Sequence, residues 1–137
     1  MKRLYIDIDG VLLTKEGAPA PHLVEFLAYA TENFDCYWLT THCKGDAGPA
    51  IQHLSQTVPS EAMPFLEKIK PTNWTTLKTE ALDFSQDFLW LDDYVLEFEK
   101  GILKKQGALD SLISIDLDSS PNQLLEFVEE SKKSSEE

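Results

Sequence analysis

Two stretches decide the fold: residues 4–11, Leu-Tyr-Ile-Asp-Ile-Asp-Gly-Val, and residues 88–93, Phe-Leu-Trp-Leu-Asp-Asp. Each is a short apolar run, typical of a strand buried on both faces, that ends in two acidic residues. If both strands belong to one parallel sheet, their carboxyl ends meet at one edge, where open α/β sheets bind ligands. Four carboxylates at that edge repel one another unless a cation lies between them. The two stretches therefore indicate a hard metal ion such as Mg²⁺.

Strand-like and helix-like segments alternate along the rest of the chain. We expect strands at 3–8, 34–39, 63–69, 87–91 and 112–115, and helices beginning near residues 22, 49, 74 and 120. This alternation favours an α/β fold: a Rossmann-like parallel sheet of about five strands, with helices on both faces. We expect one domain over residues 1–130, followed by a charged, disordered tail at 131–137.

The composition disfavours several classes of partner. The 137 residues include 24 acidic and 12 basic ones, and the net charge of −12 disfavours binding to nucleic acid or to anionic lipid. No apolar stretch is long enough to span a membrane, and the first residues do not resemble a signal peptide. The two cysteines, Cys36 and Cys43, form no CxxC pattern and fit a reduced compartment, so we expect a cytoplasmic protein.

The first acid pair has the residues that nucleophilic catalysis needs. Asp7 and Asp9 are two positions apart, so in an extended strand both would point the same way, and Gly10 would let the chain leave the strand sharply. One carboxylate can attack an electrophile while the other moves protons. The alternative is a turn or a simple metal loop. An EF-hand calcium loop is excluded, because its sixth and twelfth positions would be Leu12 and Ala18.

Candidate phosphate ligands lie between the two acid pairs. Thr40 ends a predicted strand, and a hydroxyl group with nearby backbone N–H groups suits a phosphate oxygen; Thr41 is the neighbouring alternative. Lys78 falls inside the apolar stripe of a predicted helix, where an unpaired ammonium is expensive to bury. At the carboxyl edge of the sheet it would balance the acids and a bound phosphate. Lys70 is the competing candidate.

Histidines, cysteines and tryptophans are weaker candidates. His42 follows the two threonines and could reach the edge, but a loop histidine is more often incidental. His22 and His53 occupy helical positions without ligand spacing. Cys43 lacks a third partner, which argues against a cysteine hydrolase. The tryptophans fall in predicted core elements: Trp38, Trp74 and Trp90.

The order of these motifs resembles the haloacid dehalogenase-like (HAD) hydrolase superfamily. The matching residues are Asp7-x-Asp9-Gly10-Val11, then Thr40, then Lys78, then Leu91-Asp92-Asp93. The resemblance covers residues 4–93 and implies a Mg²⁺-dependent phosphatase that acts through an aspartyl-phosphate. A noncatalytic regulatory or binding module on the same fold is the alternative. A response-regulator receiver domain fits less well, because the lysine here precedes the second acid pair.

The resemblance implies a role for each motif residue. Asp7 would be the nucleophile, and Asp9 would protonate the leaving group and then activate water, with its backbone carbonyl on the metal. Thr40 would hydrogen-bond the phosphoryl group, and Lys78 would stabilise its charge. The expected metal ligands are Asp7, Asp9, Asp92 and Asp93, the last two directly or through water. The expected substrate-binding residues are Thr40, Thr41 and Lys78.

The segments that follow Gly10 and Thr40 are too short to hold a large cap domain. A capless site is open to solvent. The family resemblance implies that such an open site accepts a bulky phosphorylated substrate, or that a neighbouring subunit of a homo-oligomer acts as a lid. The sequence does not select the substrate.

Overall fold

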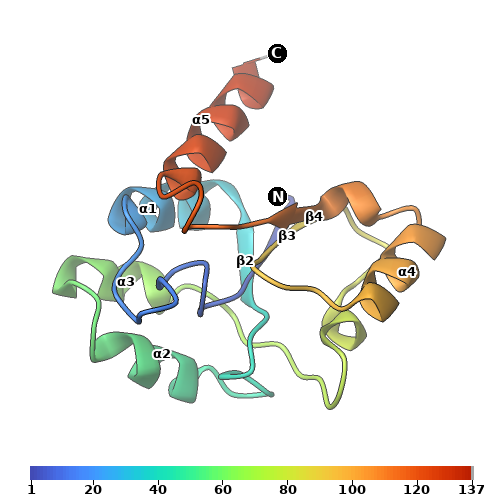
Figure 1. Ribbon diagram of the computed structural model, residues 1–137, viewed down its shortest axis with the longest axis horizontal. Coiled ribbons are helices and arrows are strands. Elements are labelled where there is room, and N and C mark those ends of the chain that lie inside the picture. The colour runs from blue at the N-terminus through green and yellow to red at the C-terminus, as the bar shows by residue number, and fades with distance from the viewer. Residues whose placement is uncertain (137) are drawn as a thin grey trace.

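A four-stranded parallel sheet organises residues 1–136, the part of the chain that the computed structural model describes (Figure 1). The strands are β1 (Arg3–Ile6), β2 (Asp35–Trp38), β3 (Phe88–Asp92) and β4 (Leu112–Ser114), and their order in the sheet is β2-β1-β3-β4. β1 is central and pairs along its whole length with both β2 and β3. Because all pairs are parallel, the four carboxyl ends share one edge.

Helices cover both faces of the sheet (Figure 1). The α-helices are α1 (Leu23–Asn33), α2 (Gly48–Ser55), α3 (Met63–Leu66), α4 (Glu97–Lys105) and α5 (Gln123–Glu136). Three short 3₁₀ turns lie in the connections: η1 (Ser60–Ala62) before α3, η2 (Lys78–Ala81) before β3 and η3 (Leu109–Ser111) before β4. Residues of α1, α2, α3 and α5 share one hydrophobic core with the sheet, and residues from the η2 region and α4 share the other.

The central strand connects these two cores. Successive side chains of a strand point to opposite faces, so Leu4 and Ile6 lie in the core under α1 and α5, whereas Tyr5 lies in the core under α4. All three side chains are fully buried. The expected α/β fold with helices on both faces of a parallel sheet is therefore present.

The expected fifth strand, at 63–69, is wrong. Residues Met63–Leu66 form α3, and only Lys70 reaches the sheet, through an isolated parallel bridge to Tyr37. Its backbone N–H donates to the carbonyl of Cys36 at 3.0 Å, and its carbonyl accepts from Trp38 at 2.8 Å. The next bond of this ladder would run from the N–H of Thr72 to the carbonyl of Trp38, but the Thr72 hydroxyl donates to that carbonyl instead, at 2.5 Å, so the ladder ends at Lys70.

The expected helix over residues 74–82 is also wrong, because η2 is a single 3₁₀ turn. Glu80 accepts hydrogen bonds from the backbone N–H groups of Thr75, Thr76 and Leu77 at 3.1, 3.1 and 2.7 Å. The segment before η2 is thus held by a side chain rather than by a helical ladder. Two consecutive threonines, with their β-branched side chains, also make helix formation less favourable.

The last helix starts later and extends further than expected. α5 begins at Gln123, not at Ser120; the amide of Gln123 donates to the carbonyl of Ser114 at 2.7 Å and accepts from the N–H of Asp116 at 2.8 Å. The helix continues through Glu136, where a disordered tail was expected, and Glu137 lies outside the described residues. No helix in residues 1–136 is long and apolar enough to cross a membrane.

We expect Glu80→Gln to destabilise the protein at neutral pH and to remove part of its acid sensitivity. Hydrogen bonds from Leu77 and Thr75 lower the pKa of Glu80 from 4.5 to about 2. The stabilisation is therefore complete above about pH 4.5 and is lost as the pH falls toward 2. Urea unfolding from pH 7 to pH 2 measures both effects. Glu32→Gln, an exposed change on α1, is the control; an equal effect there would contradict this role of Glu80.

Candidate functional site

Three of the four motif aspartates meet at the carboxyl edge of the sheet. The N–H of Asp7 donates to the carbonyl of Leu91 at 3.1 Å, which extends the pairing of β1 with β3 by one residue. The carboxylates of Asp7, Asp92 and Asp93 offer oxygen atoms that all lie within 4.8 Å of one another. We call these three residues the carboxylate cluster. Asp7 and Asp92 are buried, with 7% and 1% of their surface exposed.

Lys78 is the cation of this cluster. Its Nζ lies 2.8 Å from Oδ2 of Asp92 and 3.4 Å from Oδ2 of Asp7, and its side chain is 14% exposed. Lys78 begins η2, so it reaches the cluster without the helix on which its prediction was based. The competing candidate, Lys70, is bound elsewhere: its Nζ forms an ion pair with Asp35 at 2.8 Å.

Neighbouring residues hold Asp92 and Lys78 in place. Trp90 Nε1 donates to Oδ2 of Asp92 at 3.2 Å, and the N–H of Tyr94 donates to its Oδ1 at 3.1 Å. On the lysine side, buried Glu99 of α4 accepts from the N–H of Thr79 at 2.9 Å, next to Lys78 in η2. These bonds restrict the ion pair to one geometry.

The charges in the cluster are not balanced. Burial, together with the charge of Asp92, raises the pKa of Asp7 to about 8, although Lys78 acts in the opposite direction. Burial and Asp92 also raise the pKa of Asp93. Burial alone would lower the pKa of Lys78, but Asp7 and Asp92 together raise it, so the ammonium stays charged. One cation among three carboxylates leaves an excess of negative charge that a hard divalent cation would neutralise.

Asp9 does not join the carboxylate cluster. β1 ends at Ile6, and the carbonyl of Ile8 accepts backbone N–H groups from the next turn, including that of Val11 at 3.1 Å. The expectation that Asp7 and Asp9 point the same way is therefore wrong for their side chains. The Asp9 side chain is 60% exposed and faces two histidines instead.

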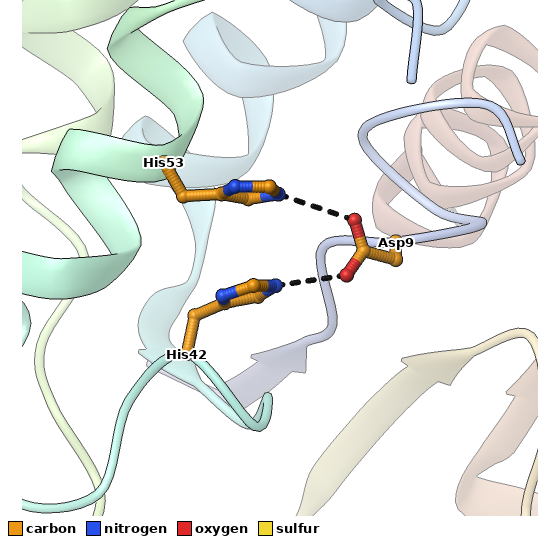
Figure 2. A group of neighbouring side chains, drawn as sticks. All are labelled: Asp9, His42 and His53. Atoms are coloured by element: carbon orange, nitrogen blue, oxygen red, sulfur yellow. Dashed lines mark hydrogen bonds and ion pairs between the residues drawn. The ribbon is translucent and has the colours of Figure 1, made fainter. Parts of the chain in front are cut away.

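Figure 2 shows this second group, which we call the histidine cluster: Asp9, His42 and His53. Nε2 of His42 lies 2.8 Å from Oδ2 of Asp9, and Nε2 of His53 lies 3.3 Å from its Oδ1. The imidazole rings stack with centroids 4.0 Å apart and planes at 13°. Burial alone would raise the pKa of Asp9, but the hydrogen bonds from both histidines outweigh it and lower this pKa.

Thr40 occupies the turn after β2, beside the first acid motif. The N–H of Leu39 donates to the carbonyl of Ile6 at 2.9 Å, which places Thr40 at the same edge as Asp7. The Thr40 hydroxyl, nearly fully buried, accepts from the N–H of His42 at 3.3 Å. Thr41 is exposed. Of the two threonines, Thr40 is thus the one whose side chain is buried at this edge.

Sequence reasoning missed the pairing of both histidines with Asp9. A signal existed for His42, which directly follows a strand that ends at the same edge as Asp9. No local signal exists for His53, because its position depends on how α2 packs, through buried Ala50 and Leu54, against the rest of the domain.

Protein-family models, curated proteins and solved structures were compared with the chain, and none of them matches it. Its function is therefore inferred from the chemistry of the carboxylate and histidine clusters.

We expect Lys78→Met to destabilise the protein by roughly 2–4 kcal/mol, because removing one partner of a buried ion pair leaves uncompensated charge. Lys70→Met is the matched control. That lysine forms an exposed pair with Asp35, so its loss should cost less than about 1 kcal/mol. Urea unfolding in the presence of a chelator measures both variants. Equal losses would contradict the central position of Lys78.

We expect Gly10→Ala to be more damaging than Gly17→Ala. Both glycines have a positive φ, +83° and +87°, which costs an alanine about 1 kcal/mol. A Cβ at Gly10 would also overlap the carboxylate of Asp93, whereas a Cβ at Gly17 meets nothing within 4 Å. Gly10→Ala should therefore lose roughly 1–3 kcal/mol more in urea unfolding. Indistinguishable variants would show that Asp93 does not pack against Gly10.

Proposed function

We propose that the chain is a small, capless member of the HAD superfamily and a Mg²⁺-dependent phosphatase that acts through an aspartyl-phosphate on Asp7. The observation that carries this proposal is the contact of Lys78 with Asp7 and Asp92 at the carboxyl edge of the sheet. A carboxylate nucleophile, a buried cation and further acids are the groups that phosphoryl transfer requires. The order of the four motifs along the chain also supports it.

Asp7 would attack the phosphorus atom, and the bond from phosphorus to the leaving oxygen would break. The nucleophile must be ionised, yet burial and the charge of Asp92 raise its pKa to about 8 in spite of Lys78. Mg²⁺ held by Asp7, Asp92, Asp93 and the backbone carbonyl of Asp9 would supply the positive charge that keeps Asp7 ionised at neutral pH. The three carboxylates fit such an ion because oxygen ligands suit hard cations.

Lys78 and Thr40 would receive the phosphoryl group. The ammonium is 3.4 Å from Oδ2 of Asp7, close enough to neutralise charge on a group attached to that carboxylate. The Thr40 hydroxyl would donate a hydrogen bond to a phosphoryl oxygen, and exposed Thr41 would contact the substrate at the rim. These contacts assist both formation and hydrolysis of the aspartyl-phosphate.

Asp9 would carry the protons. It would first donate a proton to the leaving oxygen of the substrate. It would then accept one from the water that attacks the aspartyl-phosphate, which releases phosphate and restores Asp7. Its exposed side chain gives both the leaving group and water access to it.

An open site fits a bulky substrate or a neighbouring subunit. Residues 10–22, which follow β1, contain turns and isolated bridges, and residues 40–47, which follow β2, contain turns and bends. A cavity of about 300 Å³ lies beside Asp93 and is lined by Gly10, Lys15 and residues 114–118. Tyr94 and Phe98, 72% and 68% exposed, follow the second acid pair. A large phosphorylated molecule or a second copy of the chain would cover the rings of Tyr94 and Phe98. The proposed location of the protein is the cytoplasm.

One observation favours a noncatalytic phosphate-binding module instead. Asp9 accepts hydrogen bonds from two histidines, and its pKa is lowered, whereas a general acid works best with a pKa near the working pH. In this second candidate function the carboxylate and histidine clusters would bind a phosphorylated ligand without turnover.

We expect the wild type to hydrolyse p-nitrophenyl phosphate in the presence of Mg²⁺, and we expect this hydrolysis to stop when Mg²⁺ is chelated. Asp7→Asn should lower this turnover by about a thousandfold or more, because an amide cannot act as the nucleophile. Asp35→Asn is the control, since Asp35 pairs with Lys70 away from the cluster. Unchanged turnover in Asp7→Asn would rule out the nucleophile assignment.

A panel of phosphorylated metabolites, nucleotides, sugars and phosphopeptides would then separate the two functions. Hydrolysis of any of them, lost in Asp7→Asn, supports the phosphatase. Saturable binding without phosphate release in the presence of Mg²⁺ supports the binding module.

A further inference from the structure

The histidine cluster combines side chains from three separate segments of the chain. Asp9 follows β1, His42 lies in the turn after β2, and His53 lies on α2, as Figure 2 shows. Both Nε2 atoms and both carboxylate oxygens point toward the same small region, and the ligand atoms of the three residues lie within 4.8 Å of one another. Two imidazoles and one carboxylate on one side of a site are the ligands of many divalent transition-metal centres.

The distances agree with coordination of a shared ion. The two N···O separations are 2.8 and 3.3 Å. With metal–ligand bonds of about 2.1 Å and both Asp9 oxygens on the ion, these separations correspond to N–metal–O angles of about 84° and 104°, within the range found in metal centres. The nearly parallel rings must tilt toward each other for both Nε2 lone pairs to point at one ion. In each neutral imidazole, the ring proton then resides on Nδ1.

The backbone around the cluster is already ordered. Buried Cys43 follows His42, and its N–H closes the turn to the carbonyl of Thr40 at 3.1 Å. His53 lies beside buried Leu54 on α2, and Asp9 follows buried Ile8. The three side chains themselves remain 28% to 60% exposed, so an ion can enter and keep positions open for water or substrate.

We propose that Asp9, His42 and His53 bind a divalent transition-metal ion such as Zn²⁺ at a site separate from the carboxylate cluster. Imidazole nitrogen favours Zn²⁺ and its neighbours in the first transition row, whereas a site made of carboxylates alone favours Mg²⁺. A second consequence rests on the proposed phosphatase function. An ion bound to the Asp9 carboxylate occupies the oxygen atoms that would contact the leaving group and the attacking water, so occupancy of the histidine cluster inhibits turnover.

The binding test uses Co²⁺ as a spectroscopic probe and Zn²⁺ as a competitor. The full chain, stripped with a chelator, is titrated with Co²⁺ in saturating Mg²⁺, which keeps the carboxylate cluster filled. We expect visible d–d absorption that saturates at one Co²⁺ per chain and is displaced by Zn²⁺. His42→Ala and His53→Ala should each weaken Zn²⁺ binding at least tenfold. His22→Ala is the matched control, because that histidine bonds Glu25 on α1 and should leave binding unchanged.

The Co²⁺ titration of the wild type tests the site even if a histidine variant fails to fold. Absence of a saturable Co²⁺ spectrum, or equal Zn²⁺ affinity in wild type and His42→Ala/His53→Ala, would overturn the site. Circular dichroism checks the fold of each variant.

In the Mg²⁺-dependent assay, Zn²⁺ should inhibit the wild type, and His53→Ala should need at least tenfold more Zn²⁺ for the same inhibition. Binding without phosphatase activity would uphold the site and reject the proposed function. Equal inhibition of both proteins would reject the competition at Asp9.

Discussion

The ion pair of Lys78 with Asp7 and Asp92 is the interaction on which the edge of the sheet depends. Two buried carboxylates side by side are costly to ionise, and the lysine lies 2.8 Å from one and 3.4 Å from the other. The surrounding structure maintains this contact. The pairing of β1 with β3 places the acids together, and Glu99 holds the backbone of η2, from which the lysine extends. The remaining negative charge makes this edge a place where a divalent cation could bind.

Asp7 and Asp9, two residues apart, have different chemical surroundings. Asp7 is buried among acids, and its pKa rises to about 8. Asp9 is exposed between two imidazole donors, and its pKa falls. The turn at Ile8 and Gly10 separates them by ending the alternation of the strand. One short motif thus holds two carboxylates with opposite pKa shifts. In the proposed phosphatase, Asp7 would be a nucleophile that needs a cation and Asp9 would be the proton carrier, so ions bound at the two clusters would act on one reaction.

Much of the fold could be predicted because burial leaves clear sequence patterns. Each of the four strands matches an apolar or aromatic run, and α1 follows from the spacing of its buried residues. The failures have physical causes. The run at 63–69 is apolar, but Met63–Leu66 forms α3, and the pairing with β2 ends at Lys70 because the Thr72 hydroxyl occupies the carbonyl of Trp38. The spacing of apolar residues around Lys78 resembles that of a helix, yet the carboxylate of Glu80 accepts hydrogen bonds from the backbone N–H groups of the preceding segment.

The sequence by itself determined the α/β class and the central strand that leads into Asp7. It also determined that Asp7, Asp92 and Asp93 meet, since parallel strands bring their carboxyl ends to one edge of the sheet. It also singled out Lys78, because an ammonium in an apolar segment needs a counter-charge. Only the tertiary structure decided between Lys78 and Lys70, turned Asp9 away from Asp7, and brought His42 and His53 to it. The turn at Gly10 and the place of His42 after a strand left partial signals in the sequence. The choice of Lys78 and the position of His53 left none, because a salt bridge and the packing of α2 join residues far apart in the chain.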